Sequence, residues 1–101
     1  MKGADQSAGM NSSSVESAHG DVLECIAVLC PEDEGGFSIH CVNLPGVISQ
    51  GDDESEAVEN IKDAFRETVK YHRDAKKAVP WAHVEVDRCP GARELRIPVV
   101  I

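Results

Sequence analysis

The chain has 101 residues, a formal net charge of −8 and an apolar content of 42%, which allow one small domain. Such an acidic chain is a poor candidate for general nucleic-acid binding, because neutralisation of phosphates provides most of the non-specific affinity, and a basic partner fits its charge better. No apolar run approaches the ~20 residues of a membrane span, and none follows Lys2 as it would in a signal peptide. We therefore expect a soluble, cytoplasmic protein.

The first twenty residues differ in composition from the rest of the chain. They contain five Ser, three Gly and three Ala, with few larger apolar side chains. Such a segment cannot bury enough apolar surface to offset the entropy that it would lose on ordering. We therefore expect a disordered tail at 1–20 and one folded domain at 21–101. A core of this size is only marginally adequate, and oligomerisation is a common remedy.

Three strands are expected in the first half of this domain. Residues 22–30 are mostly aliphatic and are followed by Pro31, which suits a largely buried strand. Residues 37–42 alternate between two faces, as in a half-buried strand, and residues 47–50 form a short third strand. Because the first strand is apolar on both faces, it favours a dimer.

Turn-forming residues separate these strands. The glycines of the first link can take the positive φ that a hairpin needs, and a Pro-Gly pair suits the centre of a type II turn. The residues assigned to turns are Gly35, Gly36, Pro45, Gly46 and Gly51.

The first link also contains three consecutive acids, Glu32, Asp33 and Glu34. We expect their side chains to be exposed, and no helix-capping role explains their charge. They are therefore our candidate contacts for a basic partner.

A helix is expected from about 54 to 76. Asp53 can cap its first turn, and Glu56, three residues later, completes a pattern similar to a capping box. Acids are concentrated at its start and bases at its end, which complements the helix dipole. One apolar face repeats at helical spacing and consists of Val58, Ile61, Phe65 and Val69, flanked by Ala57, Ala64 and Thr68.

The remainder of the chain contains an ambiguous segment and a last strand. Residues 82–87 alternate like a strand but lie between prolines, so we expect an extended connection, with brief pairing left open. Residues 93–101 are expected to form a strand, and Pro98 places it at a sheet edge or a bulge because proline lacks a backbone donor. The fold class is thus α+β: a two-layer β-β-β-α-β arrangement, with an antiparallel sheet covered on one face by one long helix. The other face must then be polar or be covered by a second copy.

The four cysteines do not have the spacing of a zinc site. In the absence of a secretory signal we expect a reducing compartment and structural thiols. These cysteines are Cys25, Cys30, Cys41 and Cys89.

Catalysis is not indicated by any motif. The chain has no glycine-rich phosphate loop, serine elbow or Cys-His motif, and we expect no enzymatic activity, cofactor or metal. One alternative stays open, a small metal-dependent nuclease or hydrolase, although helix capping and a solvated polar face explain the same residues better. Its candidate ligands are Asp52, Asp53, His83, Glu85 and Asp87.

The order of these motifs resembles that of the HicB-like antitoxin family. The resemblance covers residues 22–81 well and 93–101 loosely. No single motif is specific, but their order and spacing together are a fairly strong signal. The matching segments are Glu34-Gly35-Gly36-Phe37, Leu44-Pro45-Gly46, Ser49-Gln50-Gly51-Asp52, Glu56-Ala57 and Val79-Pro80-Trp81.

This resemblance implies a fold, an assembly and a partner. The fold is a partial ribonuclease-H-like core without working catalytic carboxylates, in a homodimer or higher oligomer. The partner is a small basic HicA-type toxin that cleaves RNA, whose active site the antitoxin covers. Many members append a DNA-binding segment after this domain, for which a chain ending at Ile101 has no room, so we expect no direct DNA binding. A solitary HicB-like regulatory or structural dimer with an unknown ligand is the alternative.

Overall fold

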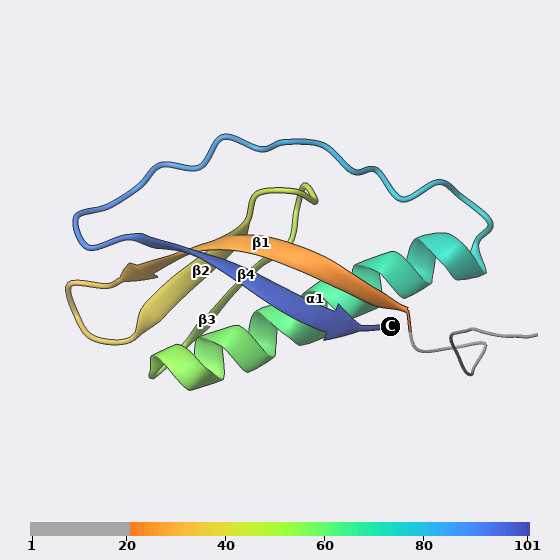
Figure 1. The fold of residues 1–101 in the computed structure, drawn as a ribbon. Helices are drawn as coiled ribbons and strands as arrows, with labels where there is room; N and C mark the ends of the chain where they lie inside the picture. Colours follow the sequence, from red (N-terminus) through yellow and green to blue (C-terminus); the bar gives the residue numbers. More distant parts are fainter. Residues whose placement is uncertain (1–20) are drawn as a thin grey trace, which may run out of the picture.

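The computed structural model describes residues 21–101, and the expectation for 1–20 lies outside the described residues. Four strands form one antiparallel sheet in the order β3-β2-β1-β4, and one helix lies across one of its faces (Figure 1). The predicted α+β class and the β-β-β-α-β order are therefore confirmed. The elements are β1 (Val22–Pro31), β2 (Phe37–Cys41), β3 (Ile48–Gly51), α1 (Glu54–Asp74) and β4 (Arg93–Val100).

The main core lies between the sheet and α1. Alternate residues of β1 point towards the helix and meet its apolar face, as the two periodicities predict. Each large side chain fully buried here contributes roughly 1.5–3 kcal/mol relative to exposure, so this layer supplies most of the stabilisation. Its fully or almost fully buried members include Cys25, Ala27, Leu29, Ile39, Leu44, Val47, Ala57, Ile61, Phe65, Val69 and Val99.

Among the strands of residues 21–101, β4 lies at one edge of the sheet and pairs with β1 alone. Pro98 stands opposite Glu24 in this ladder, and its missing N–H is tolerated because none of these strands lies on the other side of β4. The edge position predicted from Pro98 is therefore confirmed. Beyond the ladder, the Ile101 N–H donates to the Asp21 carbonyl over 2.8 Å, so the two ends of the described chain lie together.

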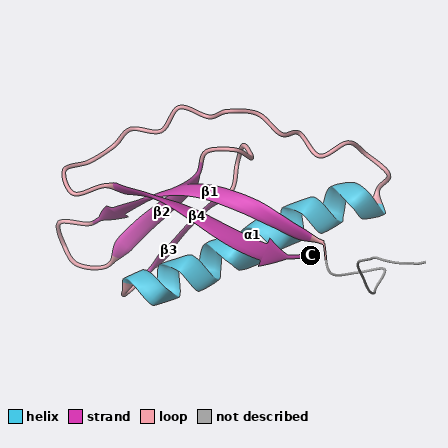
Figure 2. Cartoon of the chain, viewed as in Figure 1, coloured by secondary structure: helices cyan, strands magenta, loops and turns pink. Residues whose placement is uncertain are grey.

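Residues 75–92 connect α1 to β4 across the sheet face that α1 leaves free (Figure 2); we call this segment the strap. Most of the strap is extended, but it forms no strand, because only two backbone contacts join it to the sheet region. The Val84 N–H donates to the Val42 carbonyl over 2.8 Å, and Ala82 N lies 3.4 Å from the Asn43 carbonyl. The strap covers a second, smaller apolar cluster, which contains Val28, Cys30, Val42, Ile26, Val86, Cys89 and Ala92. The expectation that this outer face is either polar or covered by a second copy was wrong, because the chain's own connection covers part of it.

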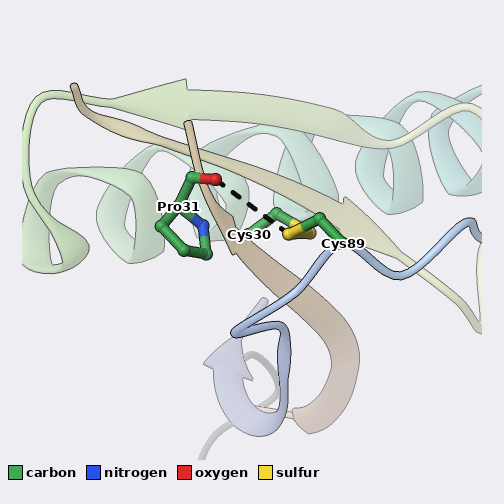
Figure 3. Close-up of a disulfide and its surroundings, with 3 residues drawn as sticks. All are labelled: Cys30, Pro31 and Cys89. Carbon is green, nitrogen blue, oxygen red and sulfur yellow. Dashed lines mark hydrogen bonds between the residues drawn. A yellow bond between two sulfur atoms is a disulfide. The ribbon is translucent and has the colours of Figure 1, made fainter. Parts of the chain in front are cut away.

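Cys30 and Cys89 form a disulfide between the end of β1 and the strap (Figure 3). Their Cα atoms are 6.1 Å apart, within the usual range for such a bond. The expectation of free thiols was therefore wrong for this pair. The physical reason is that the strap returns over the outer face of β1, which brings together two cysteines 59 residues apart.

Cys25 and Cys41 remain free and are buried in the main core. The Cys25 Sγ lies 3.8 Å from the Cys41 Sγ, to which it donates. This hydrogen bond and the burial of the thiol together raise the pKa of Cys25 far above its ordinary value. Cys25 is therefore a neutral core residue, as its position in an apolar strand predicts.

Asn43 extends the sheet where β2 separates from β1. The last β1–β2 partners are Ala27 and Cys41, and one more backbone hydrogen bond runs from the Val42 N–H to the Ile26 carbonyl over 2.7 Å. Beyond that bond the side-chain amide of Asn43 takes the place of a backbone peptide. Its Oδ1 accepts from the Ile26 N–H over 3.0 Å, and its Nδ2 donates to the Glu24 carbonyl over 2.8 Å. The same Oδ1 accepts from the Cys41 thiol over 3.0 Å, so Asn43 joins the sheet to the pair of buried thiols.

Candidate partner-binding surface

The link between β1 and β2 is a tight hairpin closed by its own backbone. The Glu32 N–H donates to the Gly36 carbonyl over 2.9 Å, and the Gly35 N–H donates to the Glu32 carbonyl over 3.0 Å. Gly35 and Gly36 both have positive φ, at 99° and 78°, a region that glycine enters without steric cost. The backbone therefore holds the hairpin in one shape and leaves its side chains free.

The three hairpin acids project into solvent. Glu32, Asp33 and Glu34 are all exposed, and within residues 21–101 none of them takes part in an ion pair. Most other acids along the sheet and helix differ in this respect. Glu24 pairs with Arg96, and Glu54 pairs with Arg93. The hairpin is thus a concentration of negative charge that the described part of the chain leaves unneutralised.

A hollow of about 310 Å³ lies between this hairpin and the start of α1. Its wall includes the acids Glu32, Asp52 and Glu56, so it continues the negative surface from the hairpin to the helix. On the helix side, the Asn60 Nδ2 donates to the Gln50 carbonyl over 2.8 Å and fixes α1 against β3. We refer to the hairpin acids, this hollow and the first turn of α1 as the acidic end.

Gly51 determines how closely α1 approaches β3. A Cβ atom at this position would lie 2.3 Å from the Ala57 N atom and 2.8 Å from its Cα, distances that no real side chain tolerates. Gly36 lies close to Gly51 in the same way, since a Cβ atom on Gly36 would lie 3.0 Å from the Gly51 carbonyl oxygen. Gly36, which has positive φ, therefore has a packing role as well as a turn role, whereas Gly51 ends β3 without positive φ and has a packing role. Together the two glycines place the hairpin beside the helix start.

The first turn of α1 is capped by side chains. The Asp53 Oδ1 accepts from the Glu56 N–H over 2.8 Å, while the Glu56 Oε1 accepts from the Asp52 N–H over 2.6 Å. Asp53 occupies the N-cap position, but Glu56 reaches one residue further back than a standard capping box requires. At the other end, α1 ends at Asp74, two residues before the expected boundary.

Pro45 and Gly46 turn the chain between β2 and β3. Gly46 has a φ of 85°, which fits the third position of a type II turn, and the Cys41 N–H donates to the Val47 carbonyl across the corner over 2.9 Å. Leu44 and Val47 on either side are buried in the main core. Pro45 and Gly46 are themselves exposed, so the corner is anchored to the core by its flanking residues, and it does not line the hollow at the acidic end.

The candidate metal ligands do not converge. Asp52 and Asp53 lie at the start of α1, whereas His83, Glu85 and Asp87 belong to the strap. The His83 Nε2 lies 2.9 Å from the Glu85 Oε2, with both side chains well exposed. Within residues 21–101, no group of three or more His, Cys, Asp or Glu side chains is placed to hold a metal ion.

The acidic end can attract and hold cationic groups. Its acids come from two segments, 32–34 and 52–56, which are apart in the sequence and which the fold brings to one side. Sequence reasoning identified the hairpin acids but missed the hollow and its polar lining by Gln50 and Asn60. The signal that could have predicted the hollow is the pattern Ser-Gln-Gly-Asp at residues 49–52, because its glycine permits the helix to approach β3.

Within the part of the chain that the structure describes, no helix combines the length and apolar character that a membrane crossing requires.

Comparison with known proteins supports the fold. No family model matches the chain, and no curated protein matches it. Among solved structures, it is similar to the N-terminal domain of antitoxin HicB from Burkholderia pseudomallei, with a TM-score of 0.58 and 18% sequence identity. The similarity covers 78% of this chain and 100% of that one. The chain therefore has a HicB-like fold along the whole length of that domain.

Proposed function

We propose that this chain is a non-enzymatic, antitoxin-like module that binds and neutralises a small basic, RNA-cleaving protein of the HicA type. The observation that carries the proposal is the acidic end on a HicB-like fold. The match in fold supports the class of function, and the unneutralised carboxylates support a basic partner. The proposal includes no cofactor and no metal.

The charge distribution suits binding to a basic protein. The hairpin acids are exposed and have no ion-pair partner within residues 21–101, so docking of a lysine or arginine breaks no ion pair among these residues. Each exposed pair contributes only about 0.2–1 kcal/mol, but several pairs together steer the encounter and set its salt dependence. We therefore expect rapid binding that weakens as the salt concentration rises.

The proposal also includes a homodimer or a higher homo-oligomer in the cytoplasm. Val22 and Val100 stand opposite each other in the β1–β4 ladder and are 60% and 55% exposed, which leaves an apolar area on the sheet outside the strap. Sedimentation velocity at several protein concentrations tests this, and a monomer at every concentration would contradict it. The acidic surface disfavours direct DNA binding.

The experiment that tests the function uses the short basic reading frame nearest to the gene as the partner. Its product is purified alone and mixed with this chain, and RNA cleavage is followed with and without an equimolar amount. We expect cleavage by the partner alone and its loss in the mixture. A partner that cleaves RNA equally well in the presence of excess chain would contradict the proposal.

Charge reversal tests whether the acidic end makes the contact. Changing Glu32, Asp33 and Glu34 together to lysine should weaken binding about tenfold to hundredfold in calorimetry, because attraction is replaced by repulsion. A matched control reverses Glu59, Asp63 and Glu67, which lie on the exposed face of α1. Both variants have the same net charge, so equal loss of affinity in the two would show that only total charge matters and would reject the assignment of the hairpin.

A further inference from the structure

The strap is attached to the rest of the domain by few non-covalent contacts. None of residues 75–92 is fully buried, and only five of them are half-buried. Its two backbone contacts with the sheet region involve Val84 and Ala82, of which the second is long at 3.4 Å. Trp81 adds a contact with Phe65, with ring centroids 5.9 Å apart, yet remains 46% exposed. Segments with so few buried contacts open at low free-energy cost.

The sheet residues beneath the strap depend on it for their burial. Val28 is 1% exposed and Val42 is 5% exposed, although both lie on the outer face, away from α1. Their apolar neighbours there include Val86 and Ala92 of the strap. Departure of the strap would therefore expose apolar surface on β1 and on the end of β2, while the main core between sheet and helix would keep its packing.

Apart from the backbone that continues into β4, the disulfide is the one covalent attachment between the strap and the sheet in the described chain. Cys30 lies near the end of β1 and is 8% exposed, whereas Cys89 is half-buried in the strap. A hollow of about 600 Å³, lined by Pro31, residues 32–35 and Cys89, opens beside it. The Cys89 Sγ lies 4.0 Å from the Pro31 carbonyl at the edge of this hollow (Figure 3). A small thiol can therefore reach Cys89 from solvent.

We propose that the Cys30–Cys89 disulfide is a reversible clasp: in the oxidised protein it holds the strap on the outer face, and its reduction by a dithiol releases the strap. The thiolate of the dithiol attacks the Cys89 Sγ, and the Cys30 thiolate leaves. The second thiol of the reagent then displaces Cys89 and closes its own disulfide. Two electrons pass from the dithiol to the protein, and each cysteine thiolate takes up a proton. This inference is independent of the proposed function, because it concerns only the chain's own fold.

The test compares the oxidised full-length chain with the same protein in dithiothreitol, by amide hydrogen exchange and by trypsin cleavage. On reduction, the protection of the Val84 N–H should fall at least tenfold, while amides of the β1–β4 ladder keep theirs. Cleavage after Arg88, in the strap, should accelerate by a similar factor. The fluorescence of Trp81, the single tryptophan of the chain, should change at the same concentration of dithiothreitol.

A variant separates the clasp from other effects of the reagent. Cys89→Ser should behave as the reduced protein does without any dithiothreitol, and the reagent should change it no further.

Three results would overturn the proposal. The Cys30–Cys89 peptide could be missing from a non-reducing digest of the oxidised protein. Protection of Val84 and cleavage after Arg88 could be the same in both redox states. Finally, reduction could abolish protection across the whole sheet, which would mean that the disulfide stabilises the entire domain and does not hold the strap alone.

Discussion

Replacement of Asn43 by alanine tests whether a side chain completes the sheet. The change removes the acceptor for the Ile26 N–H and the donor to the Glu24 carbonyl, together with the hydrogen bond from the Cys41 thiol. The Ile26 bond is partly buried, so its donor loses a partner that water replaces only in part, at a cost of about 1–2 kcal/mol. The Glu24 carbonyl is exposed and can turn to water, which adds about 0.5 kcal/mol.

We therefore expect Asn43→Ala to lower the free energy of unfolding by about 2 kcal/mol, which is a decrease of roughly 8–16 °C in the melting temperature of a domain this small. Urea unfolding followed by circular dichroism gives the free energy, and an unchanged m-value shows that the unfolded state is the same. The matched control is Asn60→Ala, which removes a single exposed hydrogen bond to the Gln50 carbonyl and should cost less than about 0.5 kcal/mol. A loss at Asn43 no larger than the loss at Asn60 would refute the reasoning.

Two further substitutions and one labelling experiment have expected outcomes. Gly51→Ala should destabilise the domain by more than about 2 kcal/mol in urea unfolding, because its Cβ would lie 2.3 Å from the Ala57 N atom; a near-neutral result would mean that α1 can move away from β3. Asp53→Ala should cost about 1 kcal/mol in thermal unfolding through loss of the N-cap, and no change would show that the cap is dispensable. Cys25 should resist thiol reagents at pH 8 until the protein unfolds, since its burial and its raised pKa both disfavour the thiolate; rapid labelling of the native protein would contradict this assignment.

Local patterns were sufficient to predict the main layers of the fold. The helical spacing of Ile61, Phe65 and Val69 identified the buried face of α1, and Pro98 placed the last strand at an edge. These features depend on residues close together in sequence, whose periodicity determines which face is buried. The exposure of the hairpin acids could also be predicted from a local pattern, because these acids lie in a short glycine-containing turn between two strands.

The other features depend on contacts between distant segments. The strap alternates at 82–87 as a strand does, but the β4 ladder already occupies that side of β1, so the strap crosses the outer face instead. The pairing of Cys30 with Cys89 follows from that crossing and not from their spacing. The role of Asn43 could not be predicted, because nothing local shows that Ile26 and Glu24 need a hydrogen-bond partner at that point. The hollow of the acidic end likewise forms only when α1 packs beside β3.

The adjacency of Asp21 and Ile101 has a practical consequence for measuring binding. β1 runs from this corner to the hairpin, and ten residues of strand span roughly 30 Å. A linker, fluorophore or surface anchor attached after Ile101 would therefore sit at one tip of the molecule, while Glu32, Asp33 and Glu34 face outwards at the other. Immobilised in that way, the chain would present its acidic hairpin to the solution without obstruction by its own attachment.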